Sequence, residues 1–280
     1  MESLFRTERS GTPNAMIVLQ GNRQTVITNK EGIGLHLKRS NYWYLKGFGI
    51  SNSRKENMDE EGIHVYDDSC DNIIRESSIA MTGLKSASHG EAIVVGRDFR
   101  HWFSRQPDQS DRNIIINNRL GPGFSTEAIV LNEGSCCGLL ARNQFDGNGM
   151  SDRNGYGCWV KIKGDRYRID NNRGTASISE GFMVIRPQES NSLLKSDLIV
   201  DMGGCDNIFE HNSCNLQSNG YCIKVVNEDM CGNIVYSDNA YSDGLALTNI
   251  PITRRKRSYK LILALMLYFR PNSFKNLNLI

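Results

Sequence analysis

Short segments in which apolar and polar residues alternate recur along this chain, and each pair of segments ends in a polar corner. Residues 128–149 show the unit: AIVLN alternates, turns at Glu133-Gly134, continues as GLLARNQF and closes in Asp-Gly-Asn-Gly. Alternation is typical of half-buried strands, and no helical periodicity runs through the unit. The pattern therefore predicts two short strands separated by turns.

The same unit recurs along most of the chain. The expected opening strands read GIGLHLK from Gly32, GIHVY from Gly62, AIVV from Ala92, AIVLN from Ala128, WVKIK from Trp159, FMVI from Phe182 and CIKVV from Cys222. Each is followed by a second strand with one apolar anchor, at Leu45, Ile74, Ile115, Leu140, Ile169, Phe209 and Val235. Three residues after the later anchors stands a polar side chain: Ser77, Asn118, Asn143, Asn172, Asn212 and Asp238.

A constant coil interrupted by inserted loops explains the uneven spacing of the anchors. Ile115 and Leu140 lie 25 positions apart, whereas Ile74 and Ile115 lie 41 positions apart, and the largest insertions fall at 97–111 and 186–197. Short strands with asparagine and glycine at the corners favour a parallel β-helix, in which equivalent asparagines form a hydrogen-bonded ladder between coils. An antiparallel sandwich is the alternative, but it would not repeat one residue type at one phase.

Three regions follow from this pattern. Residues 1–27 are expected to form N-terminal strands or a cap, and residues 28–253 the parallel β-helix of about seven coils. Residues 254–280 break the pattern with a basic run and then a nine-residue apolar stretch, 261–269, which is too short to span a bilayer. This tail is consistent with a capping helix, an interfacial helix or an unstructured end.

Composition narrows the classes of function. The net charge of +2 is too small to indicate a nucleic-acid partner, and without a run of about 20 apolar residues a membrane span is not expected. The eight cysteines do not form CxxC pairs, which disfavours a zinc site, and their number suggests an oxidising compartment. The N-terminus MESLFRTERSGTPN nevertheless lacks the apolar region of a secretory signal.

Four cysteines, Cys70, Cys136, Cys205 and Cys231, share one phase of the repeat. Successive coils lie about 4.8 Å apart, which is within the range of Cα separations that a disulfide spans. Cys205 and Cys231 belong to adjacent coils and are the expected bridge. Buried thiols that fill the stack as small apolar side chains are the alternative.

Six phrases of the chain resemble secreted right-handed parallel β-helix proteins of the pectate lyase (pectin lyase-like) superfamily. They are SGTPNAMIVLQG, GLHLKRSNYWYLKGFGISN, EGIHVYDDSCDNIIR, SDRNIIINNRLGP, NEGSCCGLLARNQFDGNGMS and WVKIKG, and the resemblance covers roughly residues 10–253. It implies an all-β, single-stranded right-handed parallel β-helix that is extracellular and, we expect, monomeric. It also implies an anionic polysaccharide such as pectate, bound along the outer face of one stacked sheet.

In the lyases of this superfamily an arginine or lysine removes the C5 proton of a uronate while aspartate and glutamate side chains hold calcium. Strand alternation leaves these residues facing outward: His36, Lys38, His64, Tyr66, Val94, Val130, Asn132, Lys161, Lys163, Met183, Ile185 and Lys224. Lys161 and Lys163 are the candidate bases, and we include His64 in the catalytic set. A solvated pair of lysines on a strand is the competing interpretation.

Carboxylates at two turns are the candidate calcium ligands: Asp67, Asp68, Asp71 and Glu133. Hard oxygen ligands suit Ca²⁺, although acidic corners are also ordinary turn chemistry. The insertion RDFRHWFSRQPDQSDR and the outward strand positions supply candidate substrate-binding residues: His36, Lys38, Arg97, Arg100, His101, Trp102 and Arg105. Aromatic rings beside guanidinium groups suit an anionic sugar chain, whereas a loop pinned by Trp102 is the structural alternative.

Two functions of different classes remain open from the sequence. The first is β-elimination on a uronate polymer, which the lysine pair and the basic aromatic loop favour. The second is a non-catalytic β-helix that binds cell-wall glycan or serves as a scaffold, which the outward apolar residues Val94, Val130, Met183 and Ile185 favour. A polygalacturonase-type hydrolase needs paired catalytic carboxylates, and it is disfavoured because no Gly-His-Gly motif supports the adjacent pair Asp67-Asp68.

Overall fold

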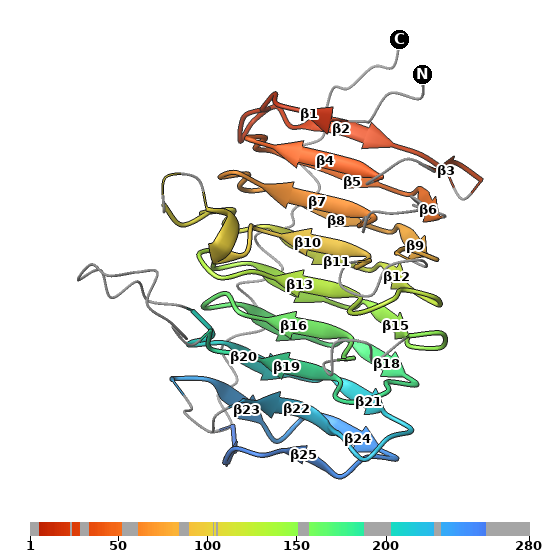
Figure 1. Ribbon diagram of the computed structural model, residues 1–280, viewed down its shortest axis with the longest axis vertical. Helices are drawn as coiled ribbons and strands as arrows, with labels where there is room; N and C mark the ends of the chain where they lie inside the picture. Colours follow the sequence, from red (N-terminus) through yellow and green to blue (C-terminus); the bar gives the residue numbers. More distant parts are fainter. Residues whose placement is uncertain are drawn as a thin grey trace.

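The computed structural model describes residues 6–22, 24–28, 34–51, 61–83, 90–102, 104, 106–150, 157–187, 203–226 and 231–255. Within these ranges the chain winds through three stacked parallel sheets, and each circuit forms one coil (Figure 1). The only helical element there is the short 3₁₀ helix η1 (Phe99–His101). No helix of this part of the chain has the length and apolarity needed to cross a membrane.

The sheets are named here by the order in which each coil visits them. The first sheet contains β1 (Arg6–Thr7), β4 (Leu35–Lys38), β7 (Ile63–Tyr66), β10 (Ile93–Val95), β13 (Ile129–Leu131), β16 (Val160–Ile162), β19 (Phe182–Val184), β22 (Tyr221–Val225) and β25 (Ala246–Thr248). The second contains β2 (Ile17–Gln20), β5 (Trp43–Lys46), β8 (Ile73–Arg75), β11 (Ile114–Ile116), β14 (Leu139–Ala141), β17 (Arg168–Asp170), β20 (Ile208–Glu210), β23 (Ile234–Tyr236) and β26 (Ile252–Thr253). The third contains β3 (Val26–Ile27), β6 (Gly49–Ser51), β9 (Ser78–Ala80), β12 (Arg119–Leu120), β15 (Gln144–Asp146), β18 (Arg173–Thr175), β21 (Ser213–Asn215) and β24 (Ala240–Ser242).

This topology confirms the parallel β-helix and rules out the antiparallel sandwich. The third sheet has eight strands, so the described ranges hold eight three-stranded coils, where the sequence predicted about seven. The additional coil comes from the N-terminal residues, because β1, β2 and β3 pair in parallel with β4, β5 and β6. From residue 256 onward the basic and apolar tail lies outside the described residues.

The inward side chains stack in the order that strand alternation predicted. The alternation that places His64 and Lys161 outward leaves eight residues of the first sheet facing inward, and they are at most 1% exposed: Ile63, Val65, Ile93, Val95, Ile129, Leu131, Val160 and Ile162. Trp159 lies parallel to Phe145 at 6.0 Å between ring centroids and edge-on to Phe182 at 6.2 Å. Gly174 faces this tryptophan, and a Cβ atom there would overlap the indole ring. A glycine is therefore needed at this position of β18.

An asparagine ladder closes the corner between the second and third sheets. Asn118, Asn143 and Asn172 are at most 1% exposed, and each donates its side-chain amide to the side-chain oxygen of the next ladder residue at 3.0–3.1 Å. Their oxygens also accept the backbone N–H of the preceding coil, for example Asn118 N to Asn143 Oδ1 at 3.0 Å. The ladder satisfies buried polar groups that would otherwise lose their hydrogen bonds.

The last rung of the ladder differs from the sequence prediction. Asn212 donates to Asn239 Oδ1 at 2.9 Å, so Asn239 occupies the position that was predicted for Asp238. Ladder residues stand three positions after the earlier anchors, but Asn239 stands four positions after Val235, because this corner holds one more residue. Asp238 instead pairs with His211 and Arg255.

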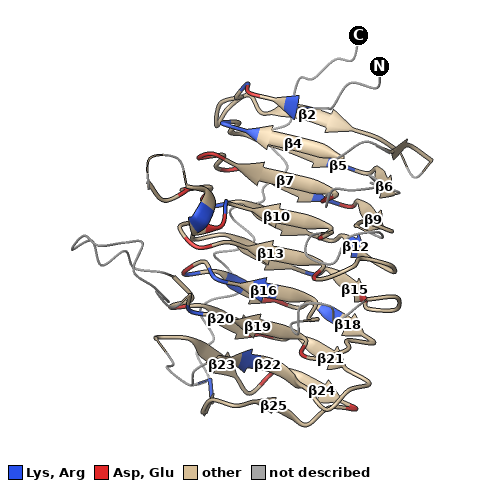
Figure 2. Cartoon of the chain, in the orientation of Figure 1, with Lys and Arg blue, Asp and Glu red and all other residues tan. Residues whose placement is uncertain are grey.

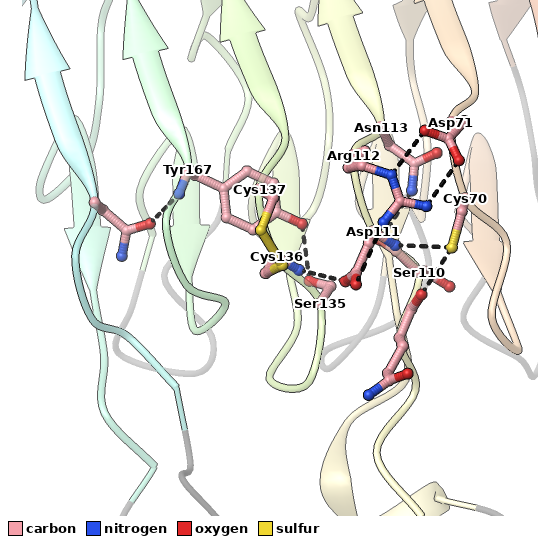
Figure 3. The surroundings of a disulfide bond; sticks show 12 residues. Cys70, Asp71, Ser110, Asp111, Arg112, Asn113, Ser135, Cys136, Cys137 and Tyr167 are labelled. Atoms are coloured by element: carbon pink, nitrogen blue, oxygen red, sulfur yellow. Dashed lines mark hydrogen bonds and ion pairs between the residues drawn. A yellow bond between two sulfur atoms is a disulfide. The ribbon is translucent and has the colours of Figure 1, made fainter.

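The corner between the first and second sheets carries the cysteines that share one phase (Figure 3). The predicted bridge between Cys205 and Cys231 is confirmed, with a Cα separation of 4.9 Å. Cys136 is bonded instead to its neighbour Cys137, and a further bridge joins Cys214 and Cys222. The two remaining cysteines, Cys70 and Cys158, are free thiols.

Aspartate and cysteine alternate along this corner from Cys70 to Cys205, which explains why Cys70 has no disulfide partner. The coil after Cys70 places Asp111 at the same phase, and the Asp111 N–H donates to Cys70 Sγ at 3.4 Å. Asp111 Oδ1 in turn accepts the N–H of Cys136 at 2.8 Å (Figure 3). One carboxylate therefore separates Cys70 from Cys136, so the shared phase does not bring these two sulfurs together.

Candidate active site

The outer face of the first sheet carries the residues that the sequence singled out. The parallel register places one column of outward side chains along it: His36, His64, Val94, Val130, Lys161, Met183 and Lys224. Val94, Val130 and Met183 are 5%, 6% and 3% exposed, although they lie outside the core cluster. The expected outward direction holds, but the middle of this face is buried rather than solvated.

One compact group lies at the N-terminal end of this face. It consists of His36, His64 and Tyr66, named here the histidine–tyrosine cluster. The Tyr66 hydroxyl lies 3.1 Å from His36 Nδ1, and the rings of His64 and Tyr66 are 4.3 Å apart between centroids. His64 Nε2 lies 3.3 Å from the carbonyl oxygen of Gly96, a contact that suits an N–H on this nitrogen. That tautomer would leave Nδ1 of His64 as a proton acceptor.

Burial sets the protonation of the cluster. It lowers the pKa of His36 to about 4, with the charges of His64, Arg6 and Arg97 acting in the same direction. Burial also lowers the pKa of His64 to about 4. The pKa of Tyr66 is raised, again mainly by burial. At neutral pH the cluster therefore presents two uncharged imidazoles and one protonated phenol.

Cations border the histidine–tyrosine cluster at the corner of the sheet. The Arg97 guanidinium lies 4.5 Å from the centroid of the Tyr66 ring and forms an ion pair with Asp67. Lys38 Nζ lies 3.5 Å from Asp67 Oδ2. Of the residues predicted to bind substrate, the structure therefore brings His36, Lys38 and Arg97 together around Tyr66.

Lys161 lies farther along the face and has a different environment. It forms an ion pair with Glu127, whose side chain is only 1% exposed. Burial lowers the pKa of Lys161, but Glu127, Cys158 and Glu91 together outweigh burial and leave the pKa above its ordinary value. Lys161 is therefore protonated at neutral pH, which suits charge neutralisation, and the role of base that the sequence suggested stays a prediction.

A column of glutamates was missed by sequence reasoning. Glu61, Glu91, Glu127 and Glu180, named here the glutamate column, each stand two residues before the first inward residue of a first-sheet strand, and all are at most 9% exposed. The pKa of Glu91 is raised to about 7 by burial and by the charges of Glu61 and Glu127. The recurring Glu-Gly or Glu-Ala before an apolar strand residue was the signal that could have revealed the column.

Lys163, the second candidate base, lies at the corner under the inserted loop. Its Nζ lies 3.0 Å from Asp98 Oδ2, 3.0 Å from Asn132 Oδ1 and 3.3 Å from Glu133 Oε2. Burial raises the pKa of Asp98, but hydrogen bonds from Arg100 and Lys163 outweigh it and hold the pKa well below its ordinary value. Lys163 therefore fastens the loop to the corner of the following coils.

The rest of the loop is arranged around Trp102. The Trp102 indole N–H donates to the carbonyl oxygen of Arg97 at 2.9 Å, and a Cβ on Gly134 would lie 3.1 Å from the indole ring. This packing matches the alternative in which the tryptophan pins the loop. Arg100 is exposed and binds Asp98, and His101 is exposed. The predicted Arg105 lies outside the described residues.

The carboxylates proposed as calcium ligands are engaged with cations and backbone N–H groups. Asp67 pairs with Arg97, and Asp71 accepts two hydrogen bonds of 2.8 Å from Arg112. Asp68 accepts the N–H of Gln109 at 2.9 Å, and Glu133 accepts the N–H of Phe99 at 2.8 Å. No group of three or more metal-ligating side chains is arranged around a common point within the described ranges. These four carboxylates are thus already engaged with protein groups, and a calcium site at them stays a prediction.

The predicted catalytic residues do not meet in one place. His64 and Lys161 share a column but are separated by Val94 and Val130. Three coil steps of about 4.8 Å place them about 14 Å apart along the stack. A single substrate bond can therefore lie beside the histidine–tyrosine cluster or beside Lys161, but not beside both.

Comparisons with known proteins bear on the scaffold. No protein-family model and no curated protein matches the chain. The crystal structure of an alginate lyase from Paenibacillus sp. str. FPU-7 is similar, with a TM-score of 0.64 and 25% sequence identity over 91% of this chain and 87% of that one. Its similarity agrees with the three parallel sheets and with the resemblance carried by the sequence phrases. The chain is a right-handed parallel β-helix of the pectin lyase-like superfamily.

Proposed function

We propose that this protein cleaves a uronate polymer by β-elimination on the outer face of its first sheet. The fold is that of a polysaccharide lyase-like β-helix, and a structural neighbour is described as an alginate lyase. Alginate and pectate are both uronate polymers, and both are therefore substrates to test. The observation that carries the proposal is the histidine–tyrosine cluster beside Arg97.

β-Elimination requires a group that neutralises the uronate carboxylate, a base for the C5 proton and an acid for the leaving oxygen. Arg97 and Lys38 supply the positive charge. His64, uncharged at neutral pH, takes the C5 proton on Nδ1, and the electron pair forms the double bond between C4 and C5. The bond from C4 to the glycosidic oxygen breaks, and protonated Tyr66 donates its proton to that oxygen.

Calcium would neutralise the same carboxylate in a metal-dependent lyase. Asp67, Asp68, Asp71 and Glu133 are already engaged with cations and backbone N–H groups, and we assign this neutralisation to side-chain cations. Asp67 is shared between Arg97 and Lys38, so a substrate carboxylate has to compete with it or join it. Arg97 presents a planar guanidinium, which suits bidentate contact with a carboxylate.

We also propose that the protein works outside the cell. Three disulfides support an oxidising compartment, because such bonds are rare in reducing ones. The Cys205–Cys231 bridge joins adjacent coils, as a structural disulfide does. An extracellular location also suits a polymeric substrate.

The test is incubation with alginate and with polygalacturonate while the ultraviolet absorbance of the unsaturated product is followed, with and without added calcium. We expect product from at least one polymer, and we expect Arg97→Gln to lower kcat/KM by about tenfold or more. Arg112→Gln is the matched control, since Arg112 also pairs with an aspartate at the same corner but lies outside the cluster. Absence of product from both polymers would refute the lyase.

A second candidate function, glycan binding without cleavage, is favoured by one specific observation. Tyr66 is only 6% exposed, and the outward residues Val94 and Val130 beside the cluster are apolar and buried. A binding module would retain immobilised alginate or polygalacturonate and form no unsaturated product. The same incubation, followed by affinity electrophoresis in gels that contain each polymer, distinguishes the two functions.

A further inference from the structure

A groove of about 560 Å³ lies on the outer face of the third sheet, on strands other than those that carry the histidine–tyrosine cluster. Its lining comes from β9, β12, β15, β18 and the turn after β12, and its polar residues are Ser78, Arg119, Gln144, Asp146, Arg173 and Thr175. We name it the arginine groove. Figure 2 shows basic positions on β12 and β18, separate from those on β16 and around η1.

The register of the third sheet aligns the charges of the arginine groove. Arg119 pairs with Gln144, and Gln144 with Arg173, so the three side chains form one column along the stack. All three are exposed, whereas Leu120 and Phe145 beside them point inward and are 1% and 3% exposed. Two coil steps separate the strand positions of the two arginines by about 10 Å.

These two arginines differ from the arginines around the first sheet. Arg97 and Arg100 are paired with aspartates, whereas the structure shows no ion pair or side-chain hydrogen bond between the guanidinium of Arg119 or Arg173 and any described residue. The acidic residue of the groove, Asp146, accepts hydrogen bonds from the backbone and side-chain nitrogens of Asn148 at 3.0 and 2.7 Å. The groove therefore offers two planar cations that pair with no carboxylate among the described residues, with an amide between them.

This spacing matches a particular class of ligand. A guanidinium binds a carboxylate through two parallel hydrogen bonds, and Gln144 can donate to or accept from hydroxyl groups. In an extended chain of 1,4-linked uronates, alternate rings direct their carboxylates to the same side, and the rings repeat at roughly the spacing of the coils. A chain lying along the stack would thus place one carboxylate at Arg119, one ring at Gln144 and the next carboxylate at Arg173.

We propose that the arginine groove is a second glycan site that holds a uronate chain without cleaving it. The identity of the polymer rests on the proposed function, but the holding role does not require that the first sheet be catalytic. The groove contains no histidine or tyrosine among its lining residues, so it lacks the acid and base pair assigned to the cluster. Its effect would be to raise the local concentration of polymer near the protein.

The test compares wild type, Arg119→Gln/Arg173→Gln and Arg142→Gln by calorimetric titration with a long oligouronate and with a neutral 1,4-linked oligosaccharide. Arg142 is an exposed arginine in the same coil as Gln144 that does not line the groove, so it controls for general charge loss. We expect the double variant to bind the oligouronate at least about tenfold more weakly than wild type, and the Arg142 variant to bind it as tightly as wild type. We expect no measurable binding of the neutral oligosaccharide to any of the three proteins. Circular dichroism checks that the variants are folded.

Equal affinity of the double variant and wild type overturns the proposal, as does an equal loss in Arg142→Gln. Activity separates this result from the lyase hypothesis. If the protein is a lyase, the double variant should raise KM for the polymer and leave the cleavage of short oligouronates unchanged. If the wild type forms no unsaturated product but its binding of the oligouronate depends on Arg119 and Arg173, the lyase hypothesis is wrong and the second glycan site is supported.

Discussion

The hydroxyl oxygen of Tyr66 lies 3.1 Å from Nδ1 of His36, one coil away on the outer face of the first sheet. Parallel register brings them together, because His36 pairs with His64 and Lys38 with Tyr66 across β4 and β7. The contact joins a phenol that stays protonated to an imidazole that stays neutral. It places a proton donor beside Arg97, where the carboxylate of a uronate can be held.

Replacing Tyr66 by phenylalanine removes the proposed acid and leaves the ring in place. We expect kcat to fall by about 10²–10⁴-fold, with the free energy of unfolding changed by only about 1 kcal/mol. Steady-state kinetics and urea unfolding measure the two effects. Tyr44→Phe is the control, since Tyr44 lies on the second sheet and its ring contacts Arg75. Full activity of Tyr66→Phe would remove the tyrosine from the mechanism.

The pH profile of kcat/KM should reflect the depressed pKa of His64. An imidazole with a pKa of about 4 is already uncharged at pH 5, so we expect activity to fall only as pH drops through about 4. For stability the sign is the same. The imidazole of His64 binds a proton more readily in the unfolded chain, where its pKa is near 6.5, than in the folded protein. The free energy of unfolding is therefore highest above pH 6.5 and decreases as pH falls from 6.5 toward 4. An acid limb centred near 6.5 would contradict the assignment.

Glu91 has the opposite dependence on pH. Its pKa is about 7 in the folded protein, raised from 4.5. Its contribution to the free energy of unfolding is therefore fully present below pH 4.5 and is lost as pH rises through about 7. Glu91→Gln should therefore stabilise the protein at pH 8 relative to wild type, on the order of 1–3 kcal/mol, with a smaller difference at pH 5. Urea unfolding at both values tests this. Glu76→Gln is the control, because the pKa of Glu76 is lowered and its loss should not stabilise at high pH.

Lys161 is predicted to stabilise the fold through Glu127. Lys161→Met leaves a carboxylate that is 1% exposed without this cation, and we expect a cost of about 3–5 kcal/mol in the free energy of unfolding. Adding Glu127→Leu should recover most of that loss, because the buried charge is then gone as well. A Lys161→Met variant that unfolds like wild type but has lost activity would give the lysine the catalytic role suggested by the sequence.

The asparagine ladder should be intolerant of truncation. Asn143 is fully buried, donates to the Ile115 carbonyl at 2.9 Å and accepts from the Asn118 backbone at 3.0 Å, so Asn143→Ala leaves several groups unsatisfied. We expect a loss of about 2–4 kcal/mol. The exposed Asn148 lies in the same coil, and Asn148→Ala should change stability by less than about 0.5 kcal/mol. Thermal and urea unfolding of the two variants give the comparison.

Much of the architecture could be predicted because its signals are local. Alternation in AIVLN assigns Ile129 and Leu131 to the interior, and the recurrence of asparagine three residues after an anchor predicts the ladder. The Cys205–Cys231 bridge could be predicted because the two cysteines occupy the same position of the repeat in adjacent coils. The Asp238 assignment failed for the same reason that the others succeeded: it assumed a corner of constant length, and that corner has one more residue.

The candidate site was predicted only in part, since its contacts join residues far apart in the chain. His36, His64 and Tyr66 were placed on the outer face, but their mutual contact and the depressed histidine pKa values depend on burial. Lys161 was predicted as a base from its outward position alone, and only the structure shows its ion pair with Glu127, 34 positions earlier in the chain. The glutamate column and the arginine groove likewise exist only once strands separated by loops of unequal length are in register.

The sequence by itself therefore determined which side chains point into the coil and which point out, because that depends on alternation within one strand. Only the tertiary structure decided which outward side chains meet, which of them are buried and which carboxylates already have a cation. Those properties depend on the stacking of coils and on the loops between them, and the charge of each group follows from the neighbours that the stacking provides.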